Sequence, residues 1–317
     1  MPEQPATGLV ARPVPEAIAT RAIRRPADPV VPYQFGVFDR AGEPVDFARL
    51  RREWPRSKTI NPTGVAETPI ERRAGTFIYG GVLINQYGHF LLESLARCWA
   101  WRTRTTEPVV FHCERPELLP WQAEALRAFG LDRSDIVFVT RCIAFERLVV
   151  PQPGYVISSF FHTEHMRALA VTPYEPLGGR KLWISRSRLG EGALGTFENE
   201  RELEALLQER GWTLLHPQEL SFTDQIRSFA GAVRLAGIEG SALHSIVHVQ
   251  DFRGTVGIVP RTPAGRLNSR NYDLIAKTKG LRQHIYPGPI AQVSGPGAFG
   301  RLAIGDVPGC VRFLDEL

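Results

Sequence analysis

The sequence of 317 residues lacks the features of a secreted or membrane-spanning protein. No apolar run approaches the roughly 20 residues that a membrane-spanning helix needs, and the N-terminal segment contains no apolar core of the signal-peptide type. The four cysteines are widely scattered, with the spacing of neither a zinc site nor a redox pair. These absences predict a cytoplasmic protein with reduced cysteines.

Lysine is also rare, since the chain contains only Lys58, Lys181, Lys277 and Lys279. The net charge of +5 therefore comes almost entirely from arginine. Excess positive charge favours an anionic partner such as a nucleotide, a nucleic acid or an anionic membrane surface. No basic run with interleaved aromatic residues occurs, so nucleic acid is not the expected partner. A peripheral contact with the inner face of the cytoplasmic membrane stays open.

The chain is expected to form two α/β domains behind a lead of residues 1–30 that is flexible or surface-hugging. The domains are residues 31–173 and 174–317, and proline and glycine cluster between them at residues 172–179. Repeated βα units on both sides predict two doubly wound, Rossmann-type parallel sheets with a ligand cleft between them. The expected strands are 77–84, 108–113, 135–140, 146–151, 181–186, 212–217, 233–236 and 255–260, and the expected helices are 86–102, 121–129, 160–171, 199–210, one after Ser221 and one after Ser241.

The stretch from Gly231 to Gln250 predicts an anion-binding turn. A buried strand at 233–236 leads through a glycine turn into a segment of helical spacing. Unpaired N–H groups at such a helix start attract phosphate. Gly240 lets the backbone approach an anion closely, and Ser241 can serve as N-cap and as a hydroxyl donor. An ordinary βα turn has the same pattern, so this stretch alone does not establish a phosphate site.

Two arginines follow the expected strand at 181–186. Arginine presents a planar fork that suits a diphosphate, and Arg186 is the expected contact. Arg188 is expected to lie in a solvated charged loop. Asn199 and Glu200 are expected to cap the next helix rather than to contact a ligand.

His89 and Glu93 lie four residues apart, so on a helix they share a face and can touch. A carboxylate beside an imidazole raises its basicity and fixes its tautomer, which suits a general base for a hydroxyl group. Two structural alternatives remain open: His89 packs at the start of the helix, or Glu93 pairs with Arg97 at the same spacing.

Five motifs follow one another along the chain. They are NQYGHFLLESLAR at 85–97, ISRSR at 184–188, NERELE at 199–204, HPQELS at 216–221 followed by DQI at 224–226, and GIEGSALH at 237–244. Each motif alone is weak, whereas five in order are fairly specific. Together they resemble the motifs of glycosyltransferase family 61, and their order and spacing hold from about residue 77 to residue 259.

The resemblance implies a GT-B fold, an inverting mechanism and no obligatory metal. The first domain would then bind the acceptor and the second domain the nucleotide-sugar. Many family members carry histidine at the position of Glu239. The residues expected to bind the donor are Arg186, Gln225, Glu239, Gly240, Ser241 and His244, and the expected catalytic residues are His89 and Glu93.

Ligands for a metal are scarce in the sequence. The chain contains no Asp-X-Asp triplet, and His162 and His165 have a spacing that permits metal binding but no evident third ligand. A transferase that depends on a carboxylate-held metal is therefore disfavoured. No cofactor is expected, and the positive charge at the diphosphate is expected to come from arginines and a helix end.

The sequence thus predicts an inverting, metal-independent glycosyltransferase. It would move a sugar from a nucleotide-sugar, with UDP as the expected nucleotide, to a glycan or a lipid-linked acceptor. One alternative is a non-catalytic nucleotide-binding or scaffold protein of the same fold. The other is a serine hydrolase with Ser241 and either His244 or His248, although Gly240-Ser241-Ala242 lacks the second glycine of a nucleophile elbow.

Overall fold

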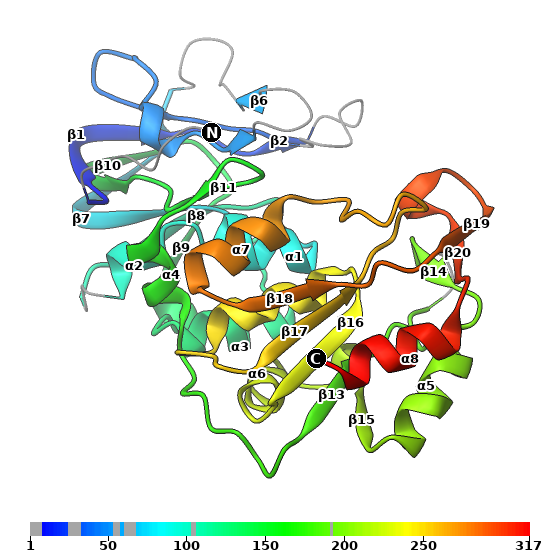
Figure 1. The fold of residues 1–317 in the computed structure, drawn as a ribbon. Coiled ribbons are helices and arrows are strands. Elements are labelled where there is room, and N and C mark those ends of the chain that lie inside the picture. Colours follow the sequence, from blue (N-terminus) through cyan, green and yellow to red (C-terminus); the bar gives the residue numbers. More distant parts are fainter. Residues whose placement is uncertain (1–7, 25–32, 53–57, 60–67, 103–105, 191–192) are drawn as a thin grey trace. The chain divides into compact units, whose positions relative to one another are not determined.

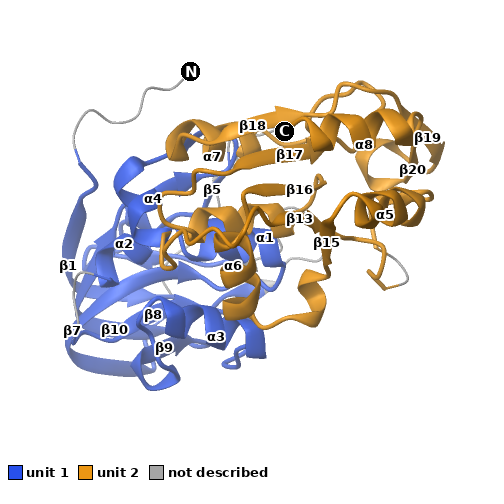
Figure 2. Cartoon of the chain, turned by 60° about the horizontal axis from the view of Figure 1, so that its bottom comes forward, with its two compact units in different colours: residues 1–169 blue, residues 170–317 orange. Residues whose placement is uncertain are grey.

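The computed structural model describes residues 8–24, 33–52, 58–59, 68–102, 106–190 and 193–317. Contacts divide the chain into two compact units, Met1–Leu169 and Ala170–Leu317, each of which has its own sheet (Figure 2). The proline- and glycine-rich residues 172–179 lie at the start of the second unit. Across these described ranges, no helix combines the length and the apolar character needed to cross a membrane.

A six-stranded mixed sheet forms the centre of the first unit, in the order β4-β1-β10-β7-β8-β9 (Figure 1). β10, β7, β8 and β9 are parallel, as predicted, whereas β1 and β4 are antiparallel to their neighbours. The sheet strands are β1 Ala11–Ala19, β4 Val37–Phe38, β7 Glu71–Val82, β8 Val109–His112, β9 Ile136–Val139 and β10 Ile143–Pro151. The other elements of this unit are β2 Ile23–Arg24, β3 Tyr33–Gln34, β5 Arg51–Arg52, β6 Lys58–Thr59, β11 Tyr155–Val156, β12 Phe160–Phe161, α1 Tyr87–His89, α2 Cys98–Trp101, α3 Pro120–Ala128, α4 Thr163–Leu169, and the short turns η1 Asp46–Ala48, η2 Phe90–Ser94 and η3 Arg133–Asp135.

Strand β1 corrects the expectation that residues 1–30 form a lead outside the fold. It pairs along its length with β10, and it carries buried side chains such as Val14 into the core. The prolines Pro13 and Pro15 are tolerated because β4 pairs with β1 only at Ile18 and Ala19, which leaves the proline stretch with an unpaired edge among the described strands. Of the expected lead, residues 1–7 and 25–30 lie outside the described residues.

The single helix expected at residues 86–102 is also corrected. The chain forms α1, then the π-helical turn η2, and only then α2. In the π turn, the N–H of Leu95 donates to the carbonyl of Phe90 at 3.2 Å, five residues back. A π turn inserts one extra residue into a helix, and apolar spacing does not reveal such an insertion.

A five-stranded parallel sheet forms the centre of the second unit, in the order β15-β13-β16-β17-β18 (Figure 1). Its strands are β13 Lys181–Ile184, β15 Trp212–Leu215, β16 Arg234–Ile238, β17 Thr255–Val259 and β18 Arg282–Ile285. The other elements are α5 Glu200–Glu209, α6 Phe222–Ala230, α7 Asn271–Lys279, α8 Val307–Asp315, β14 Thr196–Phe197, β19 Ile290–Ser294, β20 Arg301–Ile304, and the turns η4 Pro217–Glu219, η5 Ser241–His248 and η6 Gly297–Phe299.

Both faces of this parallel sheet are buried. Trp183, Ala236 and Val259 belong to a core that α5 and α8 cover (Figure 1). Leu182 and Leu235, which alternate to the opposite face, are also 0% exposed. Parallel sheets buried on both faces are typical of α/β proteins. The mixed α/β class with parallel sheets is therefore confirmed.

Candidate functional site

The carboxyl ends of β13 and β16 bring several predicted donor-binding residues together in the second unit. Counted along the chain, the strand order is 2-1-3-4-5, and its direction reverses between β13 and β16. Open α/β sheets bind ligands outside the carboxyl ends of their strands at such a switch point. Arg186 lies just beyond β13, and Glu239 and Gly240 lie just beyond β16.

Arg186 is held in place by contacts from two neighbouring segments. Its backbone N–H donates to Glu200 Oε1 at 2.8 Å, and its Nη2 donates to the carbonyl of Leu194 at 2.8 Å. Burial, and next the nearby charge of Arg261, lower the pKa of Arg186 below its ordinary value. A Cβ atom at Gly240 would lie 2.7 Å from Arg186 Nη1, so a side chain there would push the guanidinium away.

Glu239 is 1% exposed and accepts hydrogen bonds from three backbone N–H groups. Arg261 donates to Oε2 at 3.2 Å, and Asn268 and Ser269 donate to Oε1 at 2.8 and 3.2 Å. Both carboxylate oxygens therefore hold the loop that follows β17. The geometry makes Glu239 an anchor of this loop, and a direct contact with a donor stays a prediction.

Ser241 and His244 lie in η5, which is a 3-10 helix where an α-helix was expected. Gly240, not Ser241, is the N-cap, because Gly240 is the last residue with extended backbone angles. The predicted N-cap role of Ser241 is therefore wrong, although its hydroxyl lies at the first turn of η5. The His244 ring packs against Tyr272 with 4.9 Å between centroids, and the Tyr272 hydroxyl donates to the Gly240 carbonyl at 3.0 Å.

Gln225 and Asn199 both make hydrogen bonds inside the second unit. Gln225 is 3% exposed and donates from Nε2 to Ser245 Oγ at 2.9 Å, so its contact with a base or ribose stays a prediction. Ser221 caps the helix that carries Gln225, as predicted. Asn199 precedes α5 but does not cap it with its side chain. Its amide instead bonds both backbone groups of Ile304, at 2.8 and 3.0 Å.

Glu200 is a buried carboxyl group next to Arg186. Its side chain accepts the Arg186 N–H and lies near a second buried carboxyl, that of Glu204. Burial raises the pKa of Glu200, the hydrogen bond from Arg186 opposes this, and the charge of Glu204 adds to it, so the pKa reaches about 7. The carboxyl group of Glu200 therefore changes its charge near neutral pH, directly beside Arg186.

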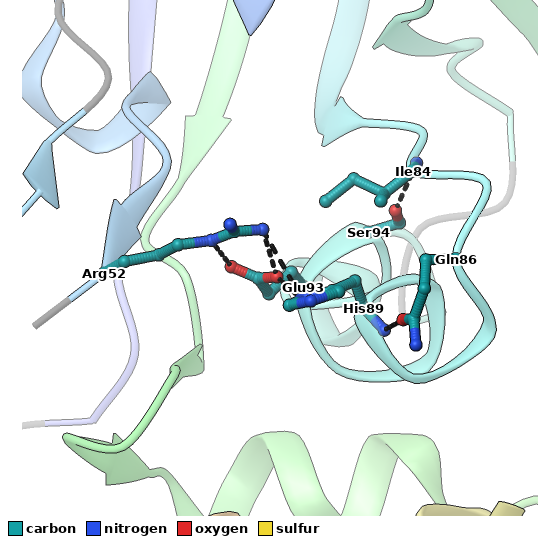
Figure 3. A network of polar contacts seen from close by, with 6 residues as sticks. All are labelled: Arg52, Ile84, Gln86, His89, Glu93 and Ser94. Carbon is teal, nitrogen blue, oxygen red and sulfur yellow. Dashed lines mark hydrogen bonds and ion pairs between the residues drawn. The ribbon is translucent and has the colours of Figure 1, made fainter. Parts of the chain in front are cut away.

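In the first unit, His89, Glu93 and Arg52 form a chain of polar contacts (Figure 3). Nδ1 of His89 forms a short hydrogen bond with Glu93 Oε2. Arg52 donates two hydrogen bonds to the same carboxylate, from Nε to Oε1 at 2.7 Å and from Nη2 to Oε2 at 2.8 Å. The side chains of Glu93 and Arg52 are 2% and 7% exposed, whereas that of His89 is 34% exposed. The imidazole is therefore the part of this network that solvent reaches.

The ionised carboxylate of Glu93 favours one tautomer of the His89 ring. Burial raises the pKa of the Glu93 carboxyl, but the hydrogen bond from His89 and the charge of Arg52 outweigh burial, so the pKa lies below its ordinary value. An ionised carboxylate accepts a hydrogen bond from Nδ1–H, and the neutral imidazole in this tautomer has a free lone pair on Nε2. That tautomer is the one a general base needs.

The turn after β7 determines where His89 stands (Figure 3). Gln86 caps α1 by accepting the N–H of His89 at 2.8 Å, and Ser94 Oγ accepts the N–H of Ile84 at 2.9 Å. The predicted contact between the side chains of His89 and Glu93 is confirmed. Their catalytic role stays a prediction.

The structure also decides two alternatives for arginines. Arg97 does not pair with Glu93, since its guanidinium donates to backbone carbonyls, among them that of Pro151 at 3.1 Å. Arg188 pairs with Glu219 at 3.1 Å, and both side chains are exposed, as expected for a solvated loop.

Sequence reasoning missed Arg52, Arg261 and Tyr272. Arg52 lies 41 positions before Glu93, and no local spacing connects the two. Arg261 was within reach of the reasoning, because it follows the carboxyl end of β17 as Arg186 follows that of β13. Tyr272 gave no comparable signal.

No group of three or more His, Cys, Asp or Glu side chains that could hold a metal ion occurs in the part of the chain that the structure describes. His162 Nδ1 accepts the N–H of Glu164 at 3.2 Å. His165 is fully buried, with Nδ1 3.8 Å from Cys98 Sγ.

The fold and these two clusters define an α/β protein with Arg186 at the switch point of its parallel sheet and a histidine held by a buried carboxylate. The family model described as glycosyltransferase 61 matches residues 87–256, more than half of the chain. The chain therefore belongs to glycosyltransferase family 61 and is a glycosyltransferase. No curated protein matches it. One similar solved structure is the bacterial iron-containing dodecameric glycosyltransferase TibC from enterotoxigenic E. coli H10407, with 9% identity over 91% of this chain and 80% of that chain, at a TM-score of 0.28.

Proposed function

We propose that this glycosyltransferase is an inverting, metal-independent enzyme of the GT-B type. It takes a sugar from a nucleotide-sugar, with UDP as the nucleotide, and transfers it to a hydroxyl group of a glycan or a lipid-linked saccharide. The first unit supplies the base and the second unit holds the donor. The observation that carries the proposal is the half-exposed His89, whose Nδ1 is bound by the buried, arginine-paired carboxylate of Glu93.

The proposed chemical step is a single displacement. Nε2 of His89 removes the proton of the acceptor hydroxyl, and the acceptor oxygen forms a bond to the anomeric carbon. The bond from that carbon to the diphosphate oxygen breaks, and its electron pair leaves with the nucleoside diphosphate. Attack opposite the leaving group inverts the anomeric configuration. Glu93 stabilises the imidazolium that results, and Arg52 keeps Glu93 ionised.

In the proposed donor site, positively charged groups of the protein bind the diphosphate without a metal. Arg186 lies at the sheet's switch point, Gly240 leaves room for its guanidinium, and Ser241 begins η5. A guanidinium fork forms strong charge-assisted hydrogen bonds with phosphate oxygens. Together with the N–H groups at the start of η5, it supports binding of the donor diphosphate.

A thermal-shift screen with nucleoside diphosphates and sugar nucleotides tests the donor class, because a bound ligand raises the apparent stability by mass action. We expect UDP and UDP-sugars to raise the melting temperature of the wild type and to do so less in Arg186→Ala. A shift without any sugar transfer would indicate the non-catalytic alternative. Labelling of Ser241 by an active-site phosphonate would indicate the hydrolase.

A further inference from the structure

Two guanidinium groups of the second unit converge on a single backbone carbonyl. Nη2 of Arg186 lies 2.8 Å from the carbonyl oxygen of Leu194, and Nη1 of Arg261 lies 3.3 Å from the same oxygen. The two arginines come from different strand ends, Arg186 beyond β13 and Arg261 beyond β17. One neutral oxygen is therefore the shared acceptor of two full positive charges.

Acidic groups act on Arg186 only from beyond ion-pairing distance, where the charges of Glu200 and Glu239 oppose the lowering of its pKa. Within the described ranges, neither guanidinium has a carboxylate at ion-pairing distance, and the Nε atom of each is buried without a hydrogen-bond partner. Burial, and after it the charge of Arg261, disfavours the charged form of Arg186 and lowers its pKa. Two like charges held close together favour an anion with several oxygens between them.

Glycines keep the space around both guanidiniums clear. A Cβ atom at Gly195 would lie 2.4 Å from Arg261 Nη1 and 2.5 Å from the carbonyl oxygen of Ala298, and one at Gly240 would lie 2.7 Å from Arg186 Nη1. Gly195 also has a φ of +67°, which side chains rarely adopt. The backbone around the two arginines therefore leaves room for a ligand to come close to both guanidinium groups.

Glu239 holds the backbone at Arg261 in place. Its Oε2 accepts the N–H of Arg261 itself, and its Oε1 accepts the N–H groups of Asn268 and Ser269 farther along the same loop. The carboxylate is 1% exposed and faces backbone donors with both oxygens. A carboxylate in direct contact with a diphosphate would repel it, whereas one that holds the loop by its backbone can bring an arginine to it.

We propose that Arg261 and Arg186 form a two-arginine clamp for the diphosphate of the donor, and that Glu239 is a positioning residue that acts through the Arg261 loop. This inference rests on the proposed function, since it assigns a second arginine and a loop anchor to the donor site of that reaction. It gives Glu239 a role different from the direct donor contact that the sequence suggested.

Isothermal titration of pyrophosphate and of UDP into the full-length protein tests the clamp. Arg261→Ala should weaken both ligands by about tenfold or more, the loss typical of a charge-assisted phosphate contact. Arg261→Lys should retain part of the affinity, because it keeps the charge and loses the fork. The matched control is Arg266→Ala, which removes an exposed arginine from the same loop and should bind both ligands as the wild type does.

A double-mutant cycle tests the positioning role. Glu239→Gln should weaken both ligands, and Glu239→Gln combined with Arg261→Ala should bind no more weakly than Arg261→Ala alone, because Glu239 acts only through Arg261. Two losses that multiply would overturn this role. The Arg261 variants decide the clamp even if Glu239→Gln does not fold.

The outcomes separate this inference from the proposed function. Wild-type affinity in Arg261→Ala, together with weakened binding in Arg186→Ala, would overturn the clamp and leave the proposed donor site intact. A wild-type protein that binds neither pyrophosphate nor UDP would overturn both.

Discussion

His89 and Glu93 form a hydrogen bond, and we propose a different chemical role for each of them. Glu93 is buried and doubly bound by Arg52, so its charge is fixed. His89 is partly exposed, so its Nε2 can meet a substrate. In the proposed reaction, the carboxylate orients the imidazole, and the imidazole exchanges the proton.

Replacement of the imidazole should abolish the proposed proton transfer without affecting the donor site. We expect His89→Ala to lower kcat by about 10²–10⁴-fold with nearly unchanged affinity for UDP. Glu93→Gln should lower kcat less, because it removes only the orienting charge. His284→Ala, which removes an exposed histidine, is the control, and near-normal turnover in His89→Ala would refute the assignment.

Replacement of Arg52 should lower the free energy of unfolding at neutral pH. Arg52→Met leaves the Glu93 charge buried with only His89 beside it, and we expect the free energy of unfolding to fall by about 3 kcal/mol at pH 7. The folded-state pKa of Glu93 lies below its ordinary value, so this stabilisation is present above the unfolded pKa and is lost as pH falls through the folded one. The difference in the free energy of unfolding between the wild type and Arg52→Met, measured by urea denaturation, should therefore be smaller at pH 4 than at pH 7. The exposed neighbour Arg51→Met should cost well under about 1 kcal/mol.

Local contacts of this network were predictable, and remote ones were not. The spacing of His89 and Glu93 predicts their contact, because residues four apart meet on one helical face. Arg52 reaches Glu93 from a separate two-residue strand, and only the folding of the chain creates that neighbourhood. Asn199 shows the same limit, since its partner Ile304 lies 105 positions away.

At the scale of elements, the regular parts of the parallel sheets were predicted well. Strands such as β8, β13 and β17 are short apolar runs between turns, and they lie where the sequence placed them. The segments next to the candidate sites were predicted less well. η2 carries an inserted residue and η5 winds more tightly than an α-helix, and apolar spacing over a few residues does not separate these forms.

Ionisation of Glu200 in helix α5 lowers the stability of the folded protein. The pKa of Glu200 is raised to about 7, so between about pH 4 and pH 7 the folded protein keeps a proton that the unfolded chain has released. Stability contributed by this residue therefore falls as pH rises through that window. We expect Glu200→Gln to raise the free energy of unfolding by about 1–3 kcal/mol at pH 8 and to change it little at pH 4.

Denaturation curves at the two pH values measure the Glu200 effect. Glu202→Gln is the matched control, because it removes an exposed carboxyl from the same helix and should leave both curves unchanged. Equal stabilisation by Glu200→Gln at pH 4 and pH 8 would contradict the assignment of the raised pKa.

At the scale of the whole molecule, arginine supplies nearly all the positive charge, and part of it gathers where the donor is proposed to bind. Arginine holds phosphate through directed hydrogen bonds as well as charge. Such a site can neutralise a leaving diphosphate without a bound cation.

Chelation tests this independence from metal. We expect turnover to be largely unchanged after treatment with EDTA and extensive dialysis, because in the proposed donor site the positive charge at the diphosphate comes from side chains and helix N–H groups. Activity that disappears with EDTA and returns specifically with manganese would show that a metal takes part.

Strand β1 has a consequence for how the protein is made. Ala11 pairs with Pro151, so β1 leaves the ribosome long before its partner β10 has been synthesised. During that interval the edge of β1 that β10 later occupies has no native neighbour, and such strand edges invite pairing with other chains. The second unit builds its parallel sheet entirely from residues made later. The nascent chain therefore passes through a stage in which its first strand needs protection, and chaperone supply during translation should affect the yield of folded enzyme.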